Sequence, residues 1–128
     1  MNRIVLDASA LLVVLNRESG AEKLTPELLS SAISSTVNLA EVHGKLVERG
    51  LSPRDAWEAT LSPVREAASF TAEHAKTAGD LITQTRSLGL SLGDRACLAL
   101  GLILGAPVYT SDKSWKKLNV GVRIYVIR

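Results

Sequence analysis

The sequence contains one cysteine and lacks a long uncharged apolar run. Cys97 cannot form an internal disulfide, and it lies in the apolar stretch 96–104, where a cysteine usually behaves as a small buried hydrophobe. A membrane span needs about 18 or more consecutive apolar residues, and no such stretch occurs. Because Arg3 and Asp7 bracket the first apolar residues, a signal peptide is not expected. We therefore expect a soluble, cytoplasmic protein with no membrane association.

The sequence also has no internal repeat and no low-complexity segment. Its 128 residues, 46% of them hydrophobic, are close to the commonest size of a compact domain with its own core. A second domain would need a longer chain. We expect residues 1–128 to form a single domain.

Basic residues slightly outnumber acidic ones, with 15 Lys and Arg against 13 Asp and Glu. If the four acids considered below form one pocket, the remainder of the chain is clearly basic, which suits a polyanion such as a nucleic acid. Arg95, Lys113 and Lys116 follow two of these acids closely and are candidate contacts for RNA phosphates. The alternative is that these charges only form a solvated surface.

Short β-type runs alternate with longer helical runs, a pattern typical of an α/β domain with a mainly parallel sheet. We expect strands at residues 3–6, 32–37, 67–70, 108–111 and 122–127. Helices are expected at 8–15, 38–49, 71–88 and 91–104, with another from Ser52 and Pro53 to near Ser62, and a short helical turn at 112–117. Residues 18–31 are predicted to form a loop with one or two short helices.

Four acidic residues stand where predicted strands end or predicted helices begin: Asp7, Glu41, Asp94 and Asp112. Ligands of open parallel sheets bind at the carboxyl edge of the strands, and all four positions point to that edge. Carboxylates gathered there raise one another's pKa unless a cation compensates. Because the candidate ligands are oxygen atoms only, Mg²⁺ or Mn²⁺ is favoured over zinc. The pattern therefore predicts a metal site suited to phosphodiester chemistry.

Each of these acids also has an ordinary structural interpretation. Asp7 and Asp112 could each cap the N-terminus of the following helix, and Asp94 has the spacing of a capping box with Ser91. Glu41 and Lys45 have the i, i+4 spacing of a surface ion pair. The metal-site hypothesis depends on all four acids occurring together.

The two histidines are not expected to take part in catalysis. His43 is two positions from Glu41 and therefore lies off its helix face, and His74 has only its neighbour Glu73 as a nearby acid. We expect both histidines to be surface residues. Metal-dependent hydrolysis requires no histidine base.

Four segments carry a family resemblance. Residues 5–11 (VLDASAL), 38–42 (NLAEV), 91–100 (SLGDRACLAL) and 109–115 (YTSDKSW) resemble the four signature motifs of PIN domains, and more narrowly those of the VapC-type ribonuclease toxins. The motifs are individually weak, but they occur in the right order over essentially the whole chain. The resemblance implies a three-layer α/β/α fold around a central parallel sheet, in agreement with the pattern of elements.

The resemblance also implies roles for particular residues. Asp7, Glu41, Asp94 and Asp112 correspond to the acidic metal site. Thr110 corresponds to the hydroxyl residue that precedes the last acid by two positions and orients the site, and Ser9 is expected to add a supporting hydrogen bond. Since residues 87–93 offer no additional acid, as some family members have, the number of metal ions stays open.

We therefore expect a Mg²⁺- or Mn²⁺-dependent endoribonuclease, the toxin of a type II toxin–antitoxin system. The resemblance implies hydrolysis of structured RNA such as tRNA to a 5′-phosphate and a 3′-hydroxyl, a homodimer, and inhibition by a cognate VapB-type antitoxin. Two alternatives remain open. One is a non-catalytic RNA-binding or interaction module, in which the acids cap helices; the other is a metal-dependent DNA nuclease or phosphatase with a similar acidic site.

Overall fold

A five-stranded parallel sheet forms the centre of the computed structural model, which describes residues 2–128. The strand order is β3-β2-β1-β4-β5, and all neighbouring strands are parallel. The strands are β1 (Ile4–Leu6), β2 (Ala32–Ser35), β3 (Glu66–Ala68), β4 (Val108–Thr110) and β5 (Ile124–Val126). The predicted α/β class with a parallel central sheet is confirmed.

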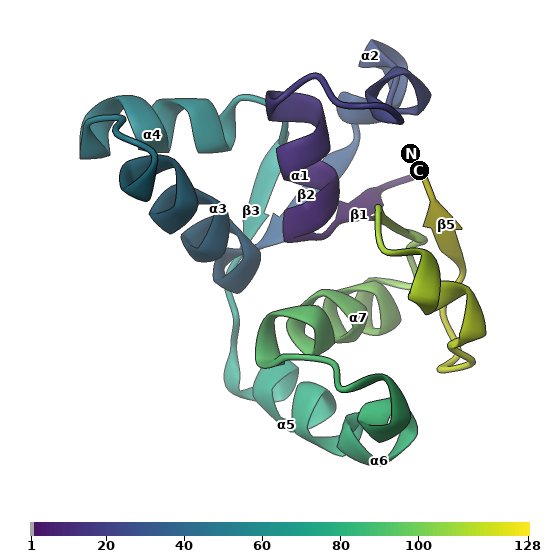
Figure 1. The fold of residues 1–128 in the computed structure, drawn as a ribbon. Coiled ribbons are helices and arrows are strands. Elements are labelled where there is room, and N and C mark those ends of the chain that lie inside the picture. Colours follow the sequence, from purple (N-terminus) through teal and green to yellow (C-terminus); the bar gives the residue numbers. More distant parts are fainter. Residues whose placement is uncertain (1) are drawn as a thin grey trace.

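Helices cover both faces of this sheet and complete a three-layer α/β/α arrangement (Figure 1). One face carries α1 (Ala8–Leu15), α3 (Thr36–Glu48) and α4 (Pro53–Leu61), and the other carries α5 (Ala72–Asp80), α6 (Ile82–Thr85) and α7 (Leu92–Leu104). The remaining elements are the short helix α2 (Pro26–Leu29) and the 3₁₀ turns η1 (Ala21–Lys23), η2 (Arg86–Leu88) and η3 (Lys113–Lys117). No helix within residues 2–128 is both long and apolar enough to cross a membrane.

Strand β1 lies in the middle of the sheet and contributes to the apolar core on each side. Ile4 and Leu6 pack with α1 and α3, whereas Val5 packs with α7. All three residues are buried, as expected for a central strand whose side chains alternate between two covered faces. Asp7 follows directly, so the packing of β1 holds this acid at the carboxyl edge of the sheet.

The long helix predicted at residues 71–88 is wrong, because the structure divides this segment. Helix α5 ends at Asp80, and α6 and η2 follow as short separate turns. Within α6, the hydroxyl of Thr85 donates to the Leu81 carbonyl 2.9 Å away, a contact that competes with regular helical bonding and bends helices. The predicted helix ends at Gly89 and Gly105 are confirmed, since both glycines adopt the left-handed conformation.

The predicted surface position is wrong for His74. This residue is only 8% exposed, and its ring lies edge-on to Phe70 with 6.2 Å between centroids. His74, Ala78 and Leu81 share the face of this region that is buried against the α7 side of the sheet. His43 is half-buried and meets the ring of Trp57 edge-on at 5.4 Å, so it too belongs to a packed contact.

Candidate functional site

Asp7 is the most buried of the four acids, with 3% of its surface exposed. It caps the N-terminus of α1, where its Oδ1 accepts from the Ala10 amide at 2.8 Å and from the Ser9 hydroxyl at 2.7 Å. Its Oδ2 accepts from the Thr110 hydroxyl at 2.6 Å. The capping interpretation is therefore correct for Asp7, and the same carboxylate is also fixed to the neighbouring strand β4.

Thr110 and Ser9 extend this hydrogen-bond network toward Asp112. The Thr110 hydroxyl oxygen accepts from the Asp112 amide at 3.1 Å, and the Ser9 hydroxyl oxygen accepts from the Ser111 amide at 2.9 Å. Asp112 is exposed and caps η3, accepting from the amide and the hydroxyl of Ser114 through Oδ1. The network therefore connects the end of β1 to the loop that follows β4.

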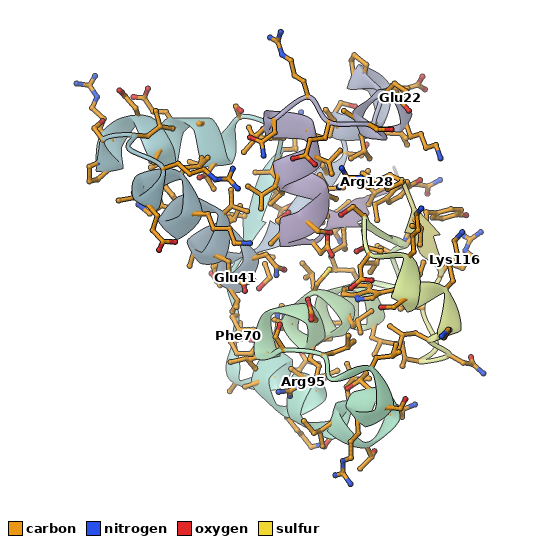
Figure 2. The ribbon with its side chains drawn as sticks, viewed as in Figure 1. Glu22, Glu41, Phe70, Arg95, Lys116 and Arg128 are labelled. Atoms are coloured by element: carbon orange, nitrogen blue, oxygen red, sulfur yellow. The ribbon has the colours of Figure 1, made fainter. Side chains whose placement is uncertain are left out.

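Glu41 lies where α3 approaches α7 (Figure 2), and Asp94 is in the first turn of α7. Glu41 Oε1 accepts from the Asn38 side-chain amide at 3.2 Å. Asp94 forms the capping box expected from its spacing, because its Oδ2 accepts from the Ser91 amide at 2.9 Å while its own amide donates to the Ser91 hydroxyl. The alternative ion pair between Glu41 and Lys45 is not formed among the described residues.

The pKa shifts of Asp7 and Cys97 connect three of the acids, Asp7, Asp94 and Glu41. Burial, only partly offset by the hydrogen bond from Thr110 and those from Ala10 and Ser9, raises the pKa of Asp7 to about 6, and the charge of Asp94 adds to the rise. Cys97 is a buried residue of α7. Burial and then the charges of Asp7, Asp94 and Glu41 raise the pKa of this thiol well above its ordinary value, so Cys97 stays protonated and is no nucleophile.

The carboxylate oxygens at this edge of the sheet are suitable ligands for a hard divalent cation, although they do not surround a single point. Within residues 2–128, no three His, Cys, Asp or Glu side chains stand close enough together to hold a metal ion. Mg²⁺ commonly keeps several waters and uses only one or two carboxylates together with substrate phosphates. Asp7 supplies a buried carboxylate with no cationic partner in the part of the chain that the structure describes, and a divalent ion would stabilise its charge.

The basic residues predicted to contact phosphates differ in their placement. Arg95 lies at the contact between α7 and α5, where its guanidinium donates to the Ala78 carbonyl at 2.9 Å and its Nε is buried (Figure 2). Because the Arg95 guanidinium is bound to α5, we do not propose Arg95 as a contact for RNA phosphates. Lys113 and Lys116 are exposed on η3, directly after Asp112.

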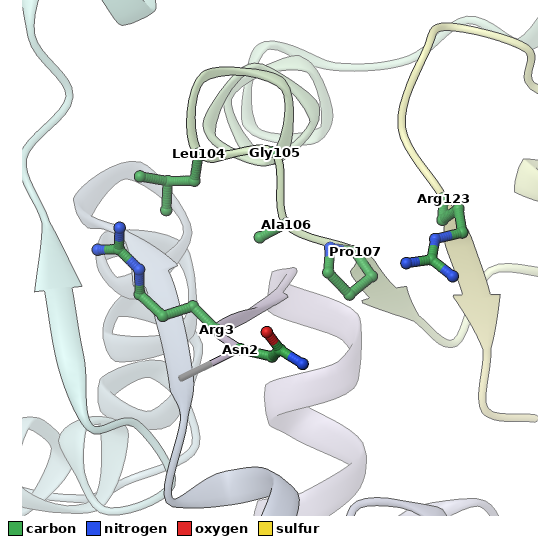
Figure 3. A pocket seen from close by; sticks show the side chains of 7 residues that line it. All are labelled: Asn2, Arg3, Leu104, Gly105, Ala106, Pro107 and Arg123. Carbon is green, nitrogen blue, oxygen red and sulfur yellow. The ribbon is translucent and has the colours of Figure 1, made fainter.

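A cavity of about 310 Å³ lies at the opposite, amino-terminal edge of the sheet (Figure 3). Its lining consists of Asn2, Arg3, Leu104, Gly105, Ala106, Pro107 and Arg123. None of the four acids contributes to it. A smaller groove of about 170 Å³ starts beside Ser9 and Ser111 and runs to Arg49 and Arg128. This groove adjoins the acidic edge, and neither arginine was predicted from the sequence, since no motif marks them.

The family model for the PIN domain matches residues 4–121. The chain belongs to the PIN-domain family. No curated protein matches the chain at a significant level of sequence similarity.

Solved structures give the same fold for this PIN domain. It resembles a chain of the DNA-bound VapBC complex from Salmonella typhimurium, with a TM-score of 0.78, 17% identity and 100% coverage of both chains. VapBC2 from Rickettsia felis, bound to a promoter DNA fragment, gives a TM-score of 0.75 and 19% identity over 98% of both chains. VapC20 from Mycobacterium tuberculosis, a sarcin–ricin loop cleaving toxin, gives 0.71 and 22% identity over 94% of this chain and 98% of that one. At these identities the likeness establishes the fold.

Proposed function

We propose that this PIN domain is a Mg²⁺- or Mn²⁺-dependent endoribonuclease and the toxin of a VapBC-type toxin–antitoxin system. The observation that carries the proposal is the placement of Asp7, a buried carboxylate at the carboxyl edge of β1 with no ion-pair partner within residues 2–128. The charge of Asp94 adds to the raised pKa of Asp7, and the charges of Asp7, Asp94 and Glu41 all raise the pKa of the buried Cys97 thiol, which supports a common site. Such an arrangement is costly for a protein without a metal ion and useful for one that binds it.

In this proposal Asp7, Glu41, Asp94 and Asp112 hold the ion, directly or through water. When bound, the ion supplies a water of lowered pKa as nucleophile and neutralises charge on the scissile phosphate. Thr110 and Ser9 orient the Asp7 carboxylate through their hydrogen bonds of 2.6 and 2.7 Å. Because these donors are hydroxyl groups on β4 and α1, they hold Asp7 in place without adding positive charge that would compete with the cation.

The substrate in this proposal is structured RNA such as tRNA, cleaved to a 5′-phosphate and a 3′-hydroxyl. Lys113 and Lys116 follow Asp112 on the exposed surface of η3 and are proposed to contact phosphates next to the cleavage site. The similar VapC20 protein is a sarcin–ricin loop cleaving toxin, which supports RNA as the polymer.

The proposed partners are a cognate VapB-type antitoxin and a second copy of the chain, all in the cytoplasm with the RNA. Several of the similar structures are VapBC complexes, which supports an antitoxin partner. Leu51 and Trp57, near the junction of α3 and α4, are 41% and 42% exposed and provide apolar surface for an interface. Light scattering tests the homodimer, and a strictly monomeric species at micromolar concentration would contradict it.

Cleavage of total RNA by the wild-type chain and by Asp7→Asn tests the activity. We expect Mn²⁺-dependent cleavage by the wild type, none in excess chelator, and none by Asp7→Asn. The matched control is Asp80→Asn, which removes an exposed carboxylate of α5 and should leave cleavage unchanged. Undiminished cleavage by Asp7→Asn, or by the wild type in chelator, would refute the proposal.

Parallel assays separate the remaining functions. Cleavage of single- or double-stranded DNA in preference to RNA would favour a DNA nuclease, and turnover of a small phosphomonoester would favour a phosphatase. Binding of RNA without any cleavage, together with a melting temperature that Mn²⁺ does not change, would favour a non-catalytic RNA-binding module.

A further inference from the structure

Asn38 connects Glu41 to the N-terminus of α7. Its side-chain amide nitrogen donates to Glu41 Oε1 at 3.2 Å and to the Gly93 carbonyl at 3.0 Å. The first contact spans one turn of α3 and the second crosses to another helix. A single buried amide therefore holds both the carboxylate and the backbone that precedes Asp94.

The burial of Asn38 comes at a cost that its hydrogen bonds only partly offset. The residue is 1% exposed, and its Oδ1 is buried without a hydrogen-bond partner within the described chain. A buried polar atom left unpaired destabilises the fold, whereas an apolar side chain of similar size at this position would avoid that cost. The amide is therefore better explained by what its nitrogen holds than by the stability of the core.

Gly93 provides the surface on which the Glu41 carboxylate rests. A Cβ atom placed on Gly93 would overlap with Glu41 Oε1 and would stand 2.7 Å from its Cδ and 2.8 Å from its Oε2. Any side chain at residue 93 therefore displaces the carboxylate. Since Gly93 lies inside α7 with no left-handed conformation, the backbone itself does not require a glycine here.

We propose that Asn38 and Gly93 are positioning residues that hold the Glu41 carboxylate beside Asp94, ready to bind a divalent cation. Glu41 has a long, exposed side chain. Without support from Asn38 and Gly93, binding of the ion would itself have to fix this side chain in one rotamer, at a cost in conformational entropy. Holding it in advance lowers that entropic cost, in the way that residues supporting metal ligands do elsewhere. The inference rests on the proposed function, because it assigns Glu41 to the same metal site.

Gly93→Ala tests the proposal with little risk to folding. The methyl group meets the flexible end of the Glu41 side chain rather than backbone, and alanine favours helix more than glycine does. The matched control is Gly44→Ala, which makes the same exchange in α3, where the new Cβ meets no described atom within 4 Å apart from its chain neighbours and the backbone of its own helix. Calorimetric titration of the RNA-free protein with Mn²⁺ should show about 10- to 100-fold weaker binding for Gly93→Ala and none of this loss for Gly44→Ala.

Asn38→Leu provides the second variant, since it replaces the buried amide with an apolar side chain of similar size. We expect Mn²⁺ binding weakened in the same range, with urea unfolding showing a folded protein. Both variants should need more Mn²⁺ for half-maximal RNA cleavage than the wild type, and saturating Mn²⁺ should restore much of the rate. A purely structural role would change unfolding without this shift in metal dependence.

Glu41→Gln separates failure of this inference from failure of the proposed function. If Glu41→Gln weakens Mn²⁺ binding while Gly93→Ala and Asn38→Leu bind like the wild type, the positioning role is wrong and the metal site stands. If Glu41→Gln also binds and cleaves like the wild type, Glu41 is no ligand, and its assignment to the metal site is wrong together with the positioning role.

Discussion

The two halves of the acidic edge hold their carboxylates in opposite ways. Asp7, between β1 and β4, is 3% exposed and accepts three hydrogen bonds. Glu41, between α3 and α7, is exposed, accepts from one amide and rests against a glycine that offers no side chain. Three hydrogen-bond donors fix the Asp7 carboxylate, whereas the Glu41 carboxylate has one donor and depends on the absence of a side chain at Gly93.

A structural role does not exclude the proposed ligand role for the same carboxylate. Asp7, Asp94 and Asp112 each cap a helix or turn. Capping places such residues at helix N-termini, and in a parallel sheet those termini lie along the edge where ligands bind. The alternatives of cap and metal ligand are therefore not exclusive, and substitution experiments have to separate them.

The largest contrast is expected in catalysis. Asp7→Asn should lower kcat/KM for RNA at least about 10³-fold, or about 4 kcal/mol, because it removes the buried charge that attracts the cation. Glu41→Gln should cost less, about 10- to 100-fold, since water can replace an exposed ligand. Steady-state cleavage of a fluorescent RNA measures both, and equal losses would remove the distinction between the two halves.

The second contrast is in the pH dependence of stability without metal. The folded protein binds the Asp7 proton more tightly than the unfolded chain does, since the pKa is about 6 rather than 3.8. The contribution of Asp7 to stability is therefore complete below about pH 4 and falls by roughly 3 kcal/mol as the pH rises through 6. Urea unfolding in chelator should show this fall in the wild type and in Glu41→Gln, but not in Asp7→Asn. If the difference in the free energy of unfolding between the wild type and Asp7→Asn stayed constant across this pH range, Asp7 would not have the raised pKa of a buried carboxylate.

The next largest effect on stability is expected from the two hydroxyl groups that donate to Asp7. Thr110→Val removes the bond to Oδ2 and should destabilise the protein by about 1.5–3 kcal/mol above pH 6, while raising the pKa of Asp7 further. Ser9→Ala should cost only about 1 kcal/mol, because Asp7 Oδ1 keeps the Ala10 amide. Urea midpoints at pH 7.5 measure both effects, and the reverse order would show that Ser9 is the main support.

The smallest effect concerns the cap of α7. Ser91→Ala should cost about 1 kcal/mol of stability, and Ser52→Ala, at the N-terminus of α4, should cost a similar amount. Neither should change Mn²⁺-dependent cleavage if the capping box serves only folding. Loss of cleavage in Ser91→Ala alone would instead assign the box a part in orienting Asp94.

Sequence patterns were sufficient for the sheet and for the edge at which the acids lie. Alternating short and long apolar runs predicted parallel strands, and the position of Asp7 after a strand placed it at the carboxyl edge. Local pattern could not show the direction of a side chain that packs between helices. Arg95 is adjacent to Asp94 in sequence but contacts α5, and His74 is buried because of the way α5 meets α7. Likewise Gly93 carries no signal by itself, since its contact with Glu41 depends on the approach of two helices.

The hydrogen bond between Thr110 and Asp7 joins residues 103 positions apart. Strands β1 and β4 are neighbours in the sheet, so β1 lacks one of its partners until β4 (Val108–Thr110) has been synthesised. Ribosomes add about 5–20 residues per second, and non-local parallel pairing is slow to form. The acidic edge therefore stays incomplete in the nascent chain until β4 and Asp112 have been synthesised, and the order of the strands delays the assembly of the site.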